Sequence, residues 1–221
     1  MTINGGNIHI TSRDDGVNIA GGNDGSGSGG DTFMRGSYHL YINGGYIYVN
    51  VVKVGNVEGD GVDSNGDIIM TGGTVIVDGP LTDMQSALDH DFPPPMGVGG
   101  FKMTGGLVVA VGSAGMAVGP NSSSTQYSVM LTFNTPRPAG TIVHLRTSSG
   151  TAMFTFESTK AYRSVVFCSP DLTKGSYEVY TGGSSTGTKV DGLYSGGTCS
   201  GGTKYTSFTI SSMVTRVGSY Y

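Results

Sequence analysis

Apolar and polar positions recur in one pattern at four places in the first half of the chain. Each copy has an apolar residue, a polar residue, two glycines and then a strand-like run, and the copies occupy residues 3–10, 42–49, 70–77 and 103–110. One pattern that returns in the same order is typical of a chain that winds into stacked coils. Glycine pairs also mark hairpins, so a hairpin-rich antiparallel protein is the alternative, which the constant order of the pattern disfavours.

Alignment of the copies predicts two inward ladders of apolar side chains, which a solenoid needs because each coil is covered only by its neighbours. The first ladder precedes the glycines and comprises Met1/Ile3, Leu40/Ile42, Ile68/Met70 and Phe101/Met103. The second follows them and comprises Ile8/Ile10, Ile47/Val49, Val75/Val77 and Val108/Ala110. The predicted fold is therefore all-β, with a right-handed parallel β-helix over residues 1–119.

The outward positions of the second run become more apolar along the chain, from Asn7 and His9 in the first copy to Leu107 and Val109 in the fourth. Exposed apolar ladders are uncommon on soluble proteins. We therefore expect the C-terminal half to cover the third and fourth coils.

A polar, turn-rich stretch at residues 119–124 predicts a boundary between residues 1–119 and a second β region at 120–221. Short alternating runs predict antiparallel strands in this second region that cap the helix. The runs are Ser128 to Phe133, Thr141 to Arg146, Ala152 to Phe156, Ser164 to Cys168, Tyr177 to Tyr180 and Ser207 to Ile210.

Charge is divided unevenly between the two regions. The 221-residue chain has a net charge of -4, but residues 1–119 carry twelve acidic and four basic residues, and residues 120–221 carry four acidic and eight basic residues. No basic run favours nucleic acid, and no apolar stretch approaches the ~20 residues that span a bilayer. Cys168 and Cys199 could form a disulfide in a secreted protein or remain two thiols.

Acidic turns follow three of the glycine pairs. If the coils stack, these turns align at about 4.8 Å, and their carboxylates repel unless a cation lies between them. Calcium suits oxygen ligands in adaptable geometry, whereas magnesium demands a tighter octahedron, and zinc would favour His or Cys. Solvated turns are the alternative. The predicted calcium ligands are Asp14, Asp15, Asn18, Glu58, Asp60, Asp63, Asn65, Asp89 and Asp91.

The run at residues 58–66, followed by the third glycine copy at 70–75 and together with residues 14–18, resembles a clostridial family of extracellular carbohydrate-binding β-helix proteins. The resemblance continues at residues 169–172, 180–184 and 192–198. It implies a fold similar to that of pectate lyases, an extracellular or cell-surface location, and calcium-assisted binding of cellulose or polygalacturonate without established lyase activity. The chain departs from the family pattern in a proline-rich loop at 92–96, in its two cysteines, and in its start inside a coil.

Tyrosines around the second glycine pair are candidates for stacking on sugar rings, namely Tyr41, Tyr46 and Tyr48. They could equally cover neighbouring loops. Arg13 and Arg35 could bind uronate carboxylates, or act as the base of a lyase by analogy with pectate lyases, although ion pairs with nearby aspartates are the simpler role. No constellation of catalytic residues can be assembled from the sequence.

A structural role is the second hypothesis. A stack that begins at Met1 without a cap, with an acidic first half and a basic second half, could join head to tail, because contacts that do not close on themselves generate filaments. The chain would then form an extracellular homopolymer.

Overall fold

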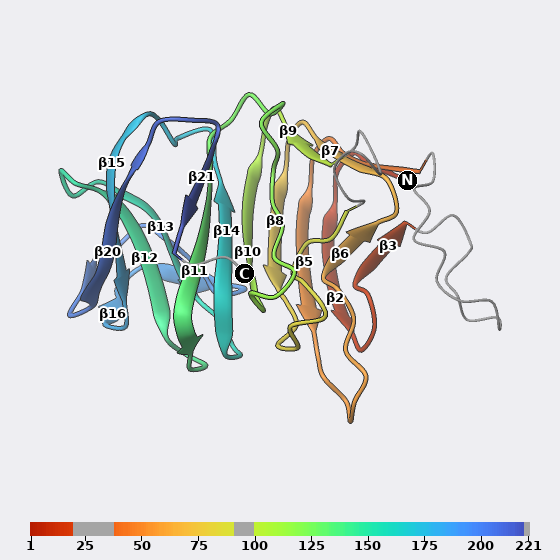
Figure 1. Ribbon diagram of the computed structural model, residues 1–221, viewed down its shortest axis with the longest axis horizontal. Coiled ribbons are helices and arrows are strands. Elements are labelled where there is room, and N and C mark those ends of the chain that lie inside the picture. The colour runs from red at the N-terminus through yellow and green to blue at the C-terminus, as the bar shows by residue number, and fades with distance from the viewer. Residues whose placement is uncertain (20–37, 91–99, 219–221) are drawn as a thin grey trace.

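The computed structural model describes residues 1–19, 38–90 and 100–218, and these residues form strands and loops without a helix (Figure 1). No helix that could cross a membrane occurs among them. The all-β prediction is confirmed. The strands of the first half are parallel, and the C-terminal half adds antiparallel pairs.

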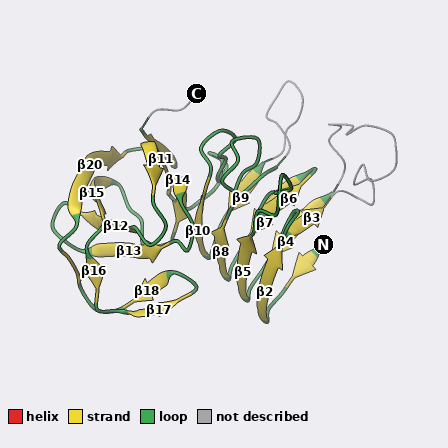
Figure 2. Ribbon diagram, turned by 90° about the horizontal axis from the view of Figure 1, so that it is seen from below, coloured by secondary structure: helices red, strands yellow, loops and turns green. Residues whose placement is uncertain are grey.

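The first half contains three parallel sheets, and each takes one strand in turn from successive passes of the chain (Figures 1 and 2). The first sheet consists of β1 (Thr2–Ile3), β4 (His39–Ile42), β7 (Asp67–Met70) and β9 (Phe101–Met103). The second begins with β2 (Asn7–Ser12), β5 (Tyr46–Val51), β8 (Thr74–Asp78) and β10 (Leu107–Gly112). The third consists of β3 (Val17–Ile19) and β6 (Val62–Ser64), with Leu88 bridged to Val62.

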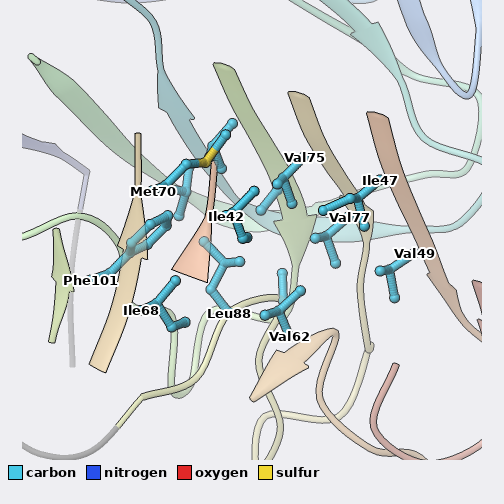
Figure 3. Close-up of a cluster of buried hydrophobic side chains, with 14 of the residues drawn as sticks. Ile42, Ile47, Val49, Val62, Ile68, Met70, Val75, Val77, Leu88 and Phe101 are labelled. Carbon is cyan, nitrogen blue, oxygen red and sulfur yellow. The ribbon is translucent and has the colours of Figure 1, made fainter. Parts of the chain in front are cut away.

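Strand register confirms the predicted ladders. In the first sheet Ile42 pairs with Ile3 and Met70, and Met70 pairs with Met103. In the second sheet residues 8, 47, 75 and 108 align, as do residues 10, 49, 77 and 110. These side chains meet those of the third sheet in one apolar core between the sheets (Figure 3). Met1 is the exception, because it is 60% exposed.

The glycine pairs lie at the corners between the first and second sheets. Gly73 has a φ of +88°, and a Cβ there would lie 2.8 Å from the carbonyl carbon of Gly44. Only glycine accepts this backbone conformation at such a close approach. The polar residue before each pair forms a ladder of its own, in which the Nδ2 atom of Asn43 donates to Asn4 at 2.8 Å and the hydroxyl of Thr71 donates to Asn43 at 2.9 Å.

The C-terminal half extends the second sheet and adds another. β11 (Ser128–Arg137), β14 (Tyr162–Cys168) and β21 (Val214–Val217) continue the second sheet, because β14 pairs with β10. The C-terminal sheet has the order β17 (Thr188–Val190), β18 (Leu193–Ser195), β13 (Ala152–Glu157), β12 (Ile142–Thr147), β15 (Gly175–Thr181) and β20 (Thr203–Ile210). A short pair, β16 (Ser184–Ser185) and β19 (Cys199–Ser200), links its hairpins. The six expected strand runs are confirmed, whereas β16 to β19 and β21 were not predicted.

The C-terminal sheet covers the outer face of β8 and β10, which carry the third and fourth copies of the repeated pattern. Ile76 and Val109 are fully buried in a second apolar cluster with residues of that sheet, including Phe154 and Phe156. The joint also contains a charged anchor that the sequence did not suggest. Asp78 accepts hydrogen bonds from Ser158 and Thr159, and the ammonium of Lys160 donates to the carbonyls of Val51, Asp78 and Gly79.

Candidate functional site

The third parallel sheet brings the acidic turns together in two columns. Asn18 pairs in register with Asp63, and Asp89 follows the bridge that joins Val62 to Leu88. The second column lies in the turn that precedes the first. There the backbone amide of Gly16 donates to the carbonyl of Asp60 at 2.9 Å. Asp15 therefore lies beside Asp60, whose next neighbour in the stack is Ser86 rather than a third carboxylate.

These carboxylates are partly buried and repel one another. Burial, with the charges of Asp89 and Asp15, raises the pKa of Asp60 to about 7. Burial also raises the pKa of Asp15, assisted by the charge of Asp14, and raises that of Asp89, assisted by Asp15. Among the described residues no lysine or arginine lowers these three pKa values. The cluster thus places negative charge where a cation would be favourable.

Asp15, Asp60 and Asp89 each accept hydrogen bonds from neighbouring groups. Asp15 accepts from the amide of Asp60 at 2.8 Å and from the Nδ2 atom of Asn18, and Asp60 accepts from the amide of Ser86. Asp89 accepts from the amide of His90 at 2.8 Å. Within residues 1–19, 38–90 and 100–218, no three His, Cys, Asp or Glu side chains converge as a metal site. The donor chemistry suits calcium, and the carboxylates would have to turn toward one point to hold it.

The other predicted ligands have different surroundings. Glu58 is 8% exposed, and its carboxylate accepts from the amides of Leu81 and Thr82 at 3.0 and 2.9 Å. Burial alone would raise the pKa of Glu58, but a hydrogen bond from the hydroxyl of Thr82, the two amide hydrogen bonds and the charge of Lys53 lower it below its ordinary value. Glu58 therefore joins two loops. Asp14 is exposed. The backbone amide of Asn65 donates to the carbonyl of Ile19, and Asp91 lies outside the described residues.

The three candidate tyrosines do not share a face. Tyr41 lies on β4, in the first sheet, where it is 37% exposed beside His39. Tyr46 and Tyr48 lie on the outer side of β5, in the second sheet, and pack against the C-terminal apolar cluster. Tyr41 thus lies on a different sheet from Tyr46 and Tyr48, so the three side chains cannot form one continuous platform for sugars. Of the candidate arginines, Arg13 is exposed and Arg35 lies outside the described residues.

A contact that the sequence did not predict joins the two halves near these tyrosines. Asp191, at the tip of the β17–β18 hairpin, accepts from the hydroxyl of Tyr46 at 2.7 Å, and its carboxylate lies 3.5 Å from Nε2 of His9. Asp191 has a φ of +48°, as the Asp-Gly turn of a tight hairpin requires. The Asp-Gly pair could have marked the hairpin, but its contacts with Tyr46, 145 residues away, and with His9 could not be inferred.

The two cysteines are free thiols. Cys168 is buried on β14, and Cys199 is partly exposed on β19. Comparison of the chain with protein-family models, with curated proteins and with solved structures finds no match.

Proposed function

We propose that this chain is a right-handed parallel β-helix protein that binds calcium and an acidic or cellulosic polysaccharide outside the cell. The calcium part rests on the two columns of oxygen-bearing side chains at the third sheet. One column places Asp15 beside Asp60, and the other aligns Asn18, Asp63 and Asp89. These are oxygen ligands at strand spacing. No described lysine or arginine lowers the pKa values of Asp15, Asp60 or Asp89, which suits a hard divalent cation.

The β-helix part is supported by the order of the strands. Each parallel sheet adds one strand from each pass of the chain, and the inward side chains form ladders between the sheets. The polysaccharide part is supported by the resemblance of residues 58–66 and 14–18 to extracellular carbohydrate-binding β-helix proteins. A polysaccharide lyase is a weaker candidate, because one candidate base, Arg13, is an exposed residue and the other, Arg35, lies outside the described residues.

Calcium binding is tested by thermal unfolding of the chelator-treated protein with calcium, with magnesium and with neither. We expect calcium to raise the melting temperature more than magnesium. The Asp60→Asn variant should lose most of this response, and Asp83→Asn, which removes the same charge from an exposed loop residue, should keep it. An equal response of Asp60→Asn and the unmodified protein would reject the site.

Polysaccharide binding is tested by affinity electrophoresis through gels that contain polygalacturonate or a soluble cellulose derivative, with and without a chelator. Retarded migration supports the proposal, and unretarded migration in every gel rejects it. Ultraviolet absorbance of the same mixtures would rise if an unsaturated lyase product formed.

Self-assembly remains the second candidate, and one observation favours it. β1, β2 and β3 each lie at the edge of their sheet among the described strands, and edge strands offer backbone groups to another chain. Electron microscopy of the purified protein should show filaments if such pairing occurs. A uniform population of monomers would remove this candidate.

A further inference from the structure

The outer face of the C-terminal sheet carries one row of polar and aromatic side chains across all six strands. Register aligns Lys204 with Tyr180, Tyr180 with His144, and His144 with Thr155. The pairing of Phe156 with Leu193 continues the row to Tyr194, which pairs with Lys189. The intervening residues, such as Val143, Val179 and Phe156, point into the apolar cluster. The row therefore lies on the side of the sheet away from this cluster. His144 and Thr155 in its middle are buried, and the lysines at its two ends are exposed.

Two groups of the same chemistry lie on this face. In the first, Glu178 accepts from the hydroxyl of Tyr180 at 3.0 Å, from Arg146 at 2.8 Å and from the ammonium of Lys204 at 2.6 Å. In the second, Glu157 accepts from the hydroxyl of Tyr194 and from the ammonium of Lys189 at 2.8 Å. Each group is thus one glutamate that accepts from a tyrosine and from one or two cations.

The two groups are spaced and held in a way that suits an extended ligand. β15 and β18 are separated by β12 and β13, so the tyrosines stand three strand spacings apart, roughly 14 Å. The hydrogen bonds restrict the side chains before any ligand arrives, which reduces the entropy lost on binding. The guanidinium of Arg146 lies 4.3 Å from the centre of the Tyr180 ring, and the side chains of Lys189 and Lys204 are each 44% exposed.

The charge of the face selects the ligand. Three cations, Arg146, Lys189 and Lys204, face two carboxylates, so one positive charge is in surplus. Residues 120–221 carry eight basic and four acidic residues, whereas residues 1–119 carry four basic and twelve acidic residues. A polyanion is therefore attracted to the C-terminal half and repelled by the acidic stack. Aromatic rings and hydrogen-bonding groups between the cations suit sugar rings.

We propose that this face binds an acidic polysaccharide, with sugar rings against Tyr180 and Tyr194 and uronate carboxylates beside Arg146 and the two lysines. This site rests on the proposed binding of polysaccharide and assigns it a place separate from the calcium column. Binding here depends on charge pairing, so it weakens at high salt and persists without calcium.

The test is affinity electrophoresis through polygalacturonate at low salt with excess chelator, on the full chain. An Arg146→Met, Tyr194→Ala double variant should bind about tenfold more weakly, because it loses a charge-assisted contact and a ring. Lys174→Met is the matched control, since it removes an exposed lysine of the same half from outside this face, and it should bind as the unmodified protein does. Tyr194→Phe keeps the ring and should retain binding.

Circular dichroism melts show whether each variant folds. If the double variant does not fold, Lys189→Met replaces it, because this variant removes one cation of the face and should also weaken binding. Binding that the double variant and Lys189→Met both leave unchanged would overturn the site while the proposed function stands. Binding that requires calcium, or is lost equally in Lys174→Met, would also overturn the site. If the face variants lose binding only in gels that contain a neutral cellulose derivative, the choice of an acidic ligand would be overturned. If the unmodified protein binds no polysaccharide, both proposals fall.

Discussion

Asp60 should destabilise the folded protein at neutral pH. Burial and the neighbouring carboxylates raise the pKa of Asp60 from 3.8 to about 7 on folding. Its protonated form is therefore favoured in the folded chain. The stability that depends on this proton is fully present below pH 3.8 and is lost as pH rises through 7, because the unfolded chain has already released its proton in that interval.

The size of the effect follows from the shift. A rise of about three pKa units at ~1.4 kcal/mol each sets a ceiling of about 4 kcal/mol. An asparagine keeps an oxygen that can accept from the amide of Ser86, but its carboxamide also loses water on burial. We therefore expect Asp60→Asn to raise the free energy of unfolding by about 2 kcal/mol at pH 8 without calcium.

The assay is urea unfolding of Asp60→Asn, Asp83→Asn and the unmodified protein between pH 4 and pH 8, in the presence of a chelator. The difference between Asp60→Asn and the unmodified protein should be near zero at pH 4 and should grow toward pH 8, whereas Asp83→Asn should show no such growth. Saturating calcium should shrink the difference, because only the native carboxylate binds the ion. A difference that stays constant from pH 4 to pH 8 would refute the reasoning.

Three further outcomes test the joint between the halves and the thiols. Ile76→Lys buries an unpaired ammonium in the second apolar cluster, so we expect insoluble protein or a loss of more than about 3 kcal/mol, and normal folding with unchanged stability would contradict the covering of β8. Asp78→Asn leaves the ammonium of Lys160, whose side chain is 18% exposed, without the carboxylate 4.0 Å away, so urea unfolding should show a loss of about 3–5 kcal/mol. The mass of the intact protein should not change on reduction, and a thiol reagent should modify Cys199 before the buried Cys168; a mass gain of two hydrogens would reveal a disulfide instead.

Local patterns predicted the ladders and most strands because both depend on neighbours in sequence. Alternation decides which side of a strand is apolar, and the glycine pair needs a backbone that other residues avoid, so the register of residues 8, 47, 75 and 108 could be inferred by alignment alone. The candidate site was inferred less completely. Loop lengths before each acidic turn differ, and only the structure shows that Ser86, rather than a carboxylate, follows Asp60.

Contacts between distant segments could not be inferred from residue type. Glu58 has the chemistry of a calcium ligand, yet it accepts the amides of Leu81 and Thr82, because a folded loop brings those donors within reach. Asp78 and Lys160 read as ordinary charged residues until the C-terminal sheet packs on β8. The same packing buries part of Tyr46 and Tyr48 and leaves Tyr41 on another face.

The sequence by itself determined the repeated strands, their inward residues and the apolar outer positions of β8 and β10, since periodicity and glycine conformation are properties of short segments. Tertiary structure alone decided which carboxylates meet, which are satisfied by backbone amides, and which tyrosines remain exposed. It also placed Tyr180 and Tyr194 in one row on the C-terminal sheet. The physical reason is that hydrogen bonding and desolvation depend on the groups that folding brings near, and such groups can lie far apart in sequence, as Tyr46 and Asp191 do at 145 residues.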